Sequence, residues 1–578
     1  MPSAFRPAFL RLLPASLVMM LLLSGAVRLS AQDVASLTGI VSDTTGAVIP
    51  DVTVTLVDTK TNTNYETSTN SVGAYYFTKL LPGPGYKVTY SKDGFETVVV
   101  TNLYLSVNTT HTQNASMQIG KTTETVEVNG TGSAVSLDTT DATIGNSLDM
   151  NMVHELPVAV RDGVLNLLRF QPGVVSALGG DEDPNSSRDG AMTGARTDQT
   201  NITVDGLDVN DYATGQSFYS TVNAPVDSVQ EFRSEVANPL SDEGRGSGSQ
   251  VSLVTKSGTN NFHGVAYEYN RITDFAANDF FNNFAGIPRA PLIRNQFGGS
   301  IGGPIIKDKL FFFFNYSGRR DVQQAPVLAT VPLDSFRAGN ISYINGSGGV
   351  STLPATGPAN TESVQNFDPL GIGADPNLTS FIQSRYPHSN STAVGDGLNT
   401  GGYQFNAPAN QTLNDYVARV DYTVNSKMKI FARASLQRET DDRVPSIAFP
   451  GDPLTFVDIN RSWAAVVGHT WTISSTKVNQ FVVGETKQEF NFPFLYNPTG
   501  TTQFNTFDSI GTGGAFLSSP YFTPASQDRA FSIPVFRDDF TYVRGKHTIQ
   551  VGGNFKPIRT FTYLLSDFNN VTLGLGGG

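Results

Sequence analysis

From residue 261 onward, apolar and polar side chains alternate with a period of two residues. In one stretch the apolar face carries Tyr416, Ala418, Val420 and Tyr422, and the opposite face carries Asp415, Val417, Arg419 and Asp421. The pattern resumes over 428–437 after a short turn, and similar hairpins are predicted at 462–485 and 536–555. Strands of about ten residues with one apolar face are typical of a membrane-spanning β-barrel, where one face meets lipid and the other a wet lumen. A soluble sandwich also alternates, and in that alternative the apolar face would meet a protein core.

The connections between these predicted strands are short on one edge and long on the other. Residues 319–414 are polar and rich in Gly, Pro, Ser and Asn, which predicts a long extracellular loop opposite short periplasmic turns. Such a loop would be unusual in a compact soluble domain. We therefore predict part of an antiparallel transmembrane β-barrel over 261–578. About ten strand candidates are present, whereas barrels with a plugged lumen have about 22, so we expect the barrel to be incomplete.

Composition excludes several classes of function. With 39 Lys and Arg against 51 Asp and Glu, the net charge of −12 argues against nucleic-acid binding. The chain has no Cys, which removes disulfides, thiolate metal sites and Cys nucleophiles. Its six His lie at no metal-ligand spacing, so no metal site is predicted. Gly298 to Gly302 fits a hydrolase motif, but its flanks are β-like rather than strand–turn–helix. We predict no catalytic residue, no cofactor and no enzymatic activity.

The first 31 residues predict a secretory signal peptide. Arg6 and Arg11 precede an apolar run from Leu12 to Leu23, and small residues follow up to Ala31. The apolar core is about a dozen residues long, too short for a bilayer that needs about 20. We expect export, with a buried N-terminal helix as the alternative.

Residues 32–119 predict a small β domain. Short strands are expected at 35–41, 52–59, 75–79, 86–92 and 96–105, separated by turn residues, which indicates a sandwich of about seven strands. The motifs Gly39-Ile40-Val41, Pro50-Asp51-Val52 and Gly73-x-Tyr75-x-Phe77 resemble the carboxypeptidase regulatory-like domain. The resemblance implies a prealbumin-like β-sandwich without catalytic residues. We expect a rigid periplasmic spacer, with sugar binding as the alternative.

Residues 131–260 contain several ordered sequence blocks. They include Glu155-Leu156-Pro157, Gln171-Pro172-Gly173-Val174, Val204-Asp205-Gly206-Leu207-Asp208, Val229-Gln230-Glu231-Phe232-Arg233 and the stretch from Val251 to Asn260. Their order resembles the plug of Oar-like TonB-dependent receptors, which implies an α+β plug domain. One departure is Ala159-Val160, where the family usually has Asn-Gly. The residues themselves predict a helix at 164–170, a strand at 202–204 that ends in an Asp-Gly turn, and a strand at 250–254.

Two sets of candidate site residues follow. Residues 120–130 form a polar, β-prone linker, and the resemblance implies that its TonB-docking residues, which pair with TonB by strand addition, are Glu124, Thr125, Val126, Glu127 and Val128. A plain linker is the alternative. Charged residues expected to gate the plug through ion pairs to the barrel wall are Arg161, Arg196, Asp205, Glu231 and Arg233. Solvated surface charge is the alternative for each.

The resemblance implies a TonB-dependent receptor in the Gram-negative outer membrane. Its expected partners are TonB, outer-membrane lipid and an extracellular ligand, namely an oligosaccharide, a peptide or a chelate that is taken up into the periplasm. Two other classes stay open: a surface adhesion or matrix-organising protein anchored by the barrel, and a secreted carbohydrate-binding β protein.

Overall fold

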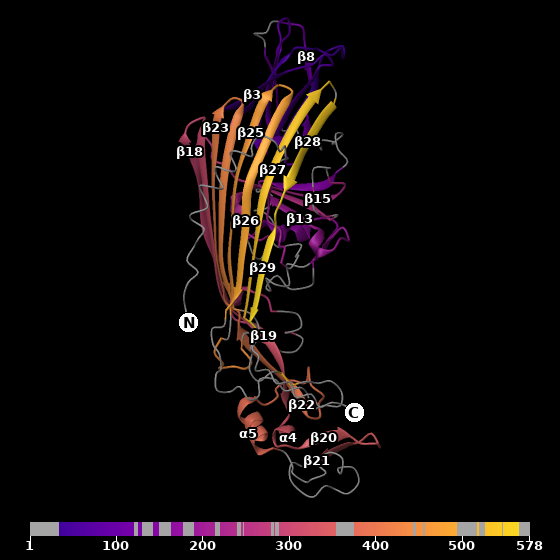
Figure 1. Ribbon diagram of the computed structural model, residues 1–578, viewed down its shortest axis with the longest axis vertical. Coiled ribbons are helices and arrows are strands. Elements are labelled where there is room, and N and C mark those ends of the chain that lie inside the picture. The colour runs from indigo at the N-terminus through magenta and orange to yellow at the C-terminus, as the bar shows by residue number, and fades with distance from the viewer. Residues whose placement is uncertain are drawn as a thin grey trace.

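The protein was examined as a computed structural model of the 578-residue chain (Figure 1). The structure describes residues 34–120, 125–129, 143–149, 163–176, 190–213, 220–239, 244, 246, 248–278, 283, 288–353, 375–442, 447–454, 457–493, 517–518, 526–545 and 547–565. The predicted signal peptide lies outside this part. Within the described residues, no helix has the length and apolar character that crossing a membrane requires.

The N-terminal domain is a sandwich of two sheets, as predicted. One sheet contains β1 (Ala35–Asp43), β4 (Ala74–Leu80), β7 (Thr110–Thr112) and β8 (Ala115–Met117). The other has the order β3 (Thr63–Ser68), β2 (Thr53–Asp58), β5 (Gly83–Ser91), β6 (Thr97–Leu105) and β9 (Thr125–Asn129). Alternate side chains of both sheets fill a shared core that includes Leu37, Leu56, Tyr75 and Val88.

The plug is built on a five-stranded sheet. Its order is β10 (Ile144–Asp149), β15 (Val229–Ala237), β16 (Gln250–Thr255), β13 (Asn201–Val204) and β14 (Leu207–Asp208). Smaller elements are the hairpin of β11 (Val174–Ser176) and β12 (Gly190–Met192) and the 3₁₀ helices η2 (Val164–Phe170), η4 (Thr197–Gln199) and η5 (Val226–Ser228). The helix expected at 164–170 is thus 3₁₀, a form common in short helical pieces. Its leucines pack onto the sheet around Phe232.

The C-terminal half forms one antiparallel sheet of eleven strands. Along the sheet lie β17 (His263–Ile272), β18 (Leu292–Ile306), β19 (Leu310–Pro332), β23 (Gln411–Asn425), β24 (Met428–Asp441), β25 (Asp458–Ser474), β26 (Lys477–Phe492), β27 (Ser526–Arg544) and β28 (His547–Phe555). β22 (Thr400–Pro408) also pairs with β19, and β29 (Arg559–Leu565) with β27. η6 (Thr273–Phe275) follows β17. Among the described strands the sheet is open, with β17 and β28 at its edges.

The predicted alternation is present on these strands. On β23, Tyr416 and Tyr422 are 37% and 41% exposed on the outer face, while Arg419 between them is buried on the inner face. Most of the strands, β18, β19 and β23 to β27, are longer than the predicted ten residues, and β19 reaches 23. Because a lipid core needs only about 9–11 residues of a tilted strand, the excess extends beyond the membrane.

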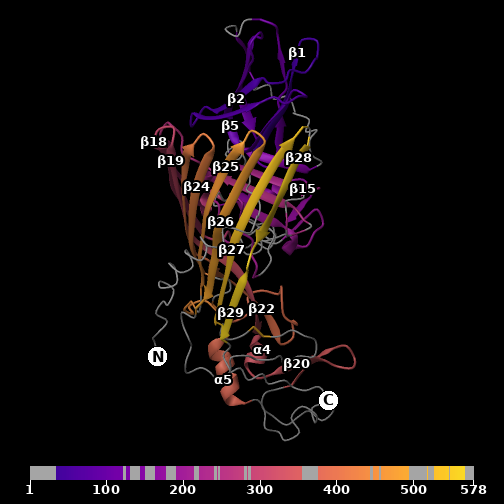
Figure 2. The same ribbon diagram turned by 45° about the horizontal axis from the view of Figure 1, so that its top comes forward.

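The described residues of the stretch predicted as a long loop, 319–353 and 375–414, are folded, which corrects that expectation. The end of β19 pairs with β22, and between them lie α4 (Asp334–Arg337), β20 (Ile341–Ile344), β21 (Val350–Leu353) and α5 (Pro376–Arg385). This cap subdomain (residues 324–353 and 375–408) has its own core, which includes Val331, Ile382, Tyr386 and Phe405. These few apolar residues are diluted among Gly, Ser and Asn, so the composition concealed them. The cap and the N-terminal sandwich lie at opposite ends of the sheet (Figures 1 and 2).

Candidate functional site

The hairpin between β13 and β14 places one carboxylate against the eleven-stranded sheet, which we call the wall. Its two-residue loop is Asp205-Gly206, and both residues have positive φ, 49° and 77°. Such a primed turn favours Asp-Gly because the Asp side chain tolerates, and Gly freely adopts, this backbone conformation. The Asp205 side chain is 1% exposed and is held by Thr255 of β16, whose N–H and hydroxyl donate to it at 3.0 and 2.8 Å.

Two barrel arginines meet this carboxylate. Arg419 Nη1 lies 2.9 Å from Asp205 Oδ1, and Arg433 Nε lies 2.8 Å from Asp205 Oδ2. Arg419 and Arg433 are directly opposite each other on β23 and β24, so their charges repel unless an anion lies between them. We name Asp205, Thr255, Arg419 and Arg433 the Asp205 cluster. It joins plug to wall through fully buried charges.

The wall supports the cluster with further contacts. Arg419 also pairs with Asp421 at 2.8 Å, and its guanidinium lies 5.0 Å from the centre of the Phe431 ring. Phe431 is paired with Gly468 on β25, where an added Cβ would come within 2.4 Å of that ring. Gly468 therefore leaves the space in which the aromatic ring supports Arg419.

A second group of contacts surrounds Asp208 of the same hairpin. Lys556 Nζ lies 2.7 Å from Asp208 Oδ2, and the Tyr212 hydroxyl donates to the same oxygen at 2.9 Å. An apolar seam accompanies these polar contacts, with Leu207 and Val222 of the plug against wall residues that include Phe431, Val466, Val482 and Ile533. The plug is thus seated by both charge and apolar contact.

The other predicted gating residues are placed differently. Arg161 lies outside the described residues, and Arg196 is exposed at the start of η4. Arg233 pairs with Glu235 of the same plug strand at 2.7 Å. Glu231 is fully buried and faces Val107, just after β6 of the sandwich. Of the five predicted residues, Asp205 forms ion pairs with the eleven-stranded sheet.

The predicted TonB-docking residues lie partly in the sandwich. Glu124 is outside the described residues, while Thr125 to Val128 belong to β9 and are exposed.

Arg419 and Arg433 were not selected as site residues from the sequence, although their charge on predicted membrane-spanning strands could have identified them. Charged side chains on membrane-spanning strands are costly unless they face the lumen and find partners there.

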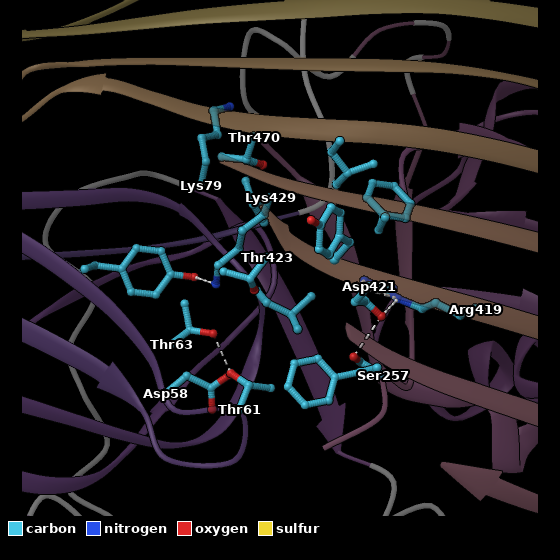
Figure 3. A pocket seen from close by; sticks show the side chains of 17 residues that line it. Asp58, Thr61, Thr63, Lys79, Ser257, Arg419, Asp421, Thr423, Lys429 and Thr470 are labelled. Atoms are coloured by element: carbon cyan, nitrogen blue, oxygen red, sulfur yellow. Dashed lines mark hydrogen bonds and ion pairs between the residues drawn. The ribbon is translucent and has the colours of Figure 1, made fainter. Parts of the chain in front are cut away.

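The sandwich packs against the wall beside the Asp205 cluster. A cavity of about 80 Å³ lies between them (Figure 3). Beside it, Lys79 of β4 pairs with Asp539 of β27 at 2.5 Å, and Lys429 of β24 donates to the Tyr65 hydroxyl. The Ser257 hydroxyl donates to Asp421 at 2.8 Å, so the rim of the cavity connects to the Asp205 cluster. Among the described side chains, no group of three or more His, Cys, Asp or Glu is placed to hold a metal.

Glu231 gives the plug–sandwich contact a pH dependence. Burial raises the pKa of Glu231 to about 7, against the lowering effects of the Val107 N–H and the Arg233 charge. A carboxyl whose pKa is raised by folding stabilises the fold below its ordinary pKa of 4.5, and that stability is lost as the pH rises through about 7. Between about pH 5 and pH 8 we expect the free energy of unfolding to fall by on the order of 3 kcal/mol relative to Glu231→Gln. Denaturant unfolding across this range measures the effect.

The matched control is Glu66→Gln, since Glu66 is exposed on the sandwich. It is expected to follow the wild-type pH profile. Parallel profiles for wild type and Glu231→Gln would show that Glu231 does not carry the effect.

Comparison with known proteins agrees with this architecture. Residues 254–574 match the family described as outer membrane beta barrel domain, and residues 36–118 match the carboxypeptidase regulatory-like domain. The chain is 26% identical over 274 residues to the TonB-dependent transporter Oar of Myxococcus xanthus, a match that covers 46% of this chain and 25% of Oar. The predicted Oar-like resemblance is confirmed.

Solved structures give weaker similarities. The siderophore receptor PirA from Acinetobacter baumannii is 14% identical with a TM-score of 0.42, over 72% of this chain and 48% of that one. The outer membrane transporter YddB from Escherichia coli is 12% identical with a TM-score of 0.42, over 73% and 48%. The chain thus spans about a quarter of the curated relative and about half of these structures.

The family match also fixes the location of the chain. The predicted localisation in the Gram-negative outer membrane is confirmed by the match over 254–574. The curated relative is named as a transporter, which agrees with the prediction of a non-enzymatic chain. Because the match over 254–574 covers more than half of its residues, the chain belongs to the outer membrane β-barrel domain family.

Proposed function

We propose that this chain is part of a receptor that binds an extracellular ligand and admits it to the periplasm when TonB pulls on residues 124–128. The observation that carries the proposal is the Asp205 cluster, in which a plug turn bridges two arginines of the wall. This contact holds the plug against the inner face of the eleven-stranded sheet.

A buried ion pair is suited to a seat that must open. Desolvation of the charges offsets much of their attraction, so such a pair contributes little net stability compared with apolar packing. When the plug moves, Asp205, Arg419 and Arg433 regain water in the lumen, which offsets the loss of their contact. At the Asp205 cluster, a force on the plug therefore works against a small difference in free energy.

The ligand itself binds elsewhere in this proposal. The cap subdomain lies at the far end of the sheet from the sandwich (Figure 2) and has a hydrophobic core of its own. The cap occupies the place of a surface loop but has a defined structure. Surface segments held by a scaffold are common binding sites, so the cap suits recognition of a ligand before transport.

Deletion of residues 124–128 tests the TonB-docking role. The labelled C-terminal domain of TonB serves as the probe, added to the chain in detergent micelles. We expect the wild-type chain to bind the probe and the deleted chain to lose binding by at least about tenfold in Kd, because no strand is left to add.

Replacement of residues 124–128 by five Gly and Ser residues keeps the linker length and is the matched control. It is expected to bind as poorly as the deletion, which attributes the loss to these side chains and their strand propensity. Unchanged binding after the deletion would place the docking segment elsewhere in the chain.

A further inference from the structure

The segment 125–129 is an added strand of the N-terminal sandwich. It runs parallel to β6 as β9, with Thr97 opposite Thr125 and Thr101 opposite Asn129. The sequence had indicated only a linker or an edge strand for another chain. In the structure this segment already has a partner, and that partner is its own sandwich.

The side-chain pattern fits this pairing. Val98 and Val100 of β6 point into the sandwich core, and their register partners on β9 are Val126 and Val128. Residues directly opposite on neighbouring strands project to the same face, so the two β9 valines extend the apolar face of the sheet at its rim. They remain 41% and 46% exposed, so backbone hydrogen bonds rather than burial hold β9 in place.

The other edge of β9 is open among the described strands. β9 is the last strand of its sheet, and no described strand pairs with its outer edge. An open edge presents a row of backbone N–H and C=O groups to any strand with a complementary edge. Because β9 is already extended, its ordering is not an additional entropic cost when a partner strand binds.

β6 also connects this edge to the plug. The residues that follow it, Val107 and Asn108, contact the plug, where the Asn108 amide donates to the Ser252 hydroxyl at 2.9 Å and Glu231 faces the Val107 N–H. A load applied to β9 is therefore shared with β6 through the ladder and passes directly to β15 and β16.

We infer that the sandwich is the platform that presents β9, and that the partner strand adds to the open edge of β9 while β9 stays paired with β6. This inference rests on the proposed function, because it takes the partner to be the strand-donating domain of TonB. It assigns the sandwich a role in docking and force transfer, in place of a passive spacer.

A disulfide between β6 and β9 tests the inference. The chain has no Cys, and Val99 and Glu127 are register partners on the outward face, so Val99→Cys with Glu127→Cys introduces one reactive pair. Neighbouring strands lie about 4.8 Å apart, within the span of a disulfide. The control is Thr97→Cys with Glu127→Cys, whose positions are offset by two residues along the strand. Together with the spacing between the strands, this offset places their Cα atoms roughly 8 Å apart, beyond the reach of a disulfide.

The measurement is binding of the labelled TonB C-terminal domain to the oxidised and reduced chain. We expect the Val99–Glu127 pair to cross-link, the control not to, and the oxidised chain to bind within about twofold of the reduced chain or more tightly. A loss of about tenfold or more on oxidation would show that β9 must leave β6 to bind. Failure of this pair to cross-link would contradict the strand pairing itself.

The outcome also separates this inference from the proposed function. If the reduced chain binds the probe and the chain without residues 124–128 does not, the docking role stands whatever the disulfide does. If both bind equally, the docking role fails before the disulfide is considered.

Discussion

Replacing Asp205 by Asn is expected to loosen the plug by about 3–5 kcal/mol, since one partner of a buried charge cluster is removed. Asn keeps the size and the turn preference of Asp, but it leaves Arg419 and Arg433 facing each other without their shared anion. The measurement is hydrogen exchange of the backbone amides of β13 and β16, which should exchange faster as the plug opens locally.

The matched control for this substitution is Asp198→Asn. Asp198 lies in the same domain and is exposed in η4, so its change alters the charge equally without uncovering a buried guanidinium. We expect it to change the opening free energy by at most about 0.5 kcal/mol. Equal effects of the two substitutions would mean that Asp205 does not seat the plug.

Replacing Lys79 by Met is expected to release the sandwich from the wall. The side chains of Lys79 and Asp539 are 4% and 2% exposed, so the substitution leaves the Asp539 carboxylate buried and unpaired. The expected cost is about 3–5 kcal/mol, which shifts the docking equilibrium by about two to four orders of magnitude. Limited proteolysis of the linker after the sandwich, compared with wild type, measures the released fraction.

Two further variants make this prediction specific. Lys487→Met removes a lysine whose partner Glu489 is also on the wall, but both side chains are over one third exposed, so a cost below about 1 kcal/mol is expected. Lys79→Met combined with Asp539→Leu removes both charges and should recover most of the docking. A double variant as open as the single one would assign docking to other contacts, such as the hydrogen bond from the Asn70 side chain to Gly545.

Local patterns in the sequence predicted the wall well. The alternation around Tyr416 and Arg419 reflects the two faces of a single strand. A shift by one residue would turn every apolar side chain to the wrong face, so the pattern determines which side chains face outward. The dipeptide Asp205-Gly206 likewise sufficed to predict the turn, because both residues readily adopt positive φ. Such features are readable because their cause lies within a few residues of chain.

Other features depend on partners far along the chain. Asp205 and Arg419 are 214 residues apart, so no local pattern could name one as the partner of the other. β3 was missed because its sequence, Thr63 to Ser68, is almost wholly polar and its strand state comes from pairing with β2. The pairing of β9 with β6 was hidden for the same reason.

The unbroken course of β19 has a mechanical consequence. Its first residues pair with β18 and β23 in the wall, and from Gln324 to Pro332 it pairs with β22 in the cap subdomain. At about 3.4 Å per residue this single strand is roughly 75 Å long. Because the same strand runs from the wall into the cap, the cap can tilt relative to the wall only if β19 bends or its hydrogen bonds to the neighbouring strands break.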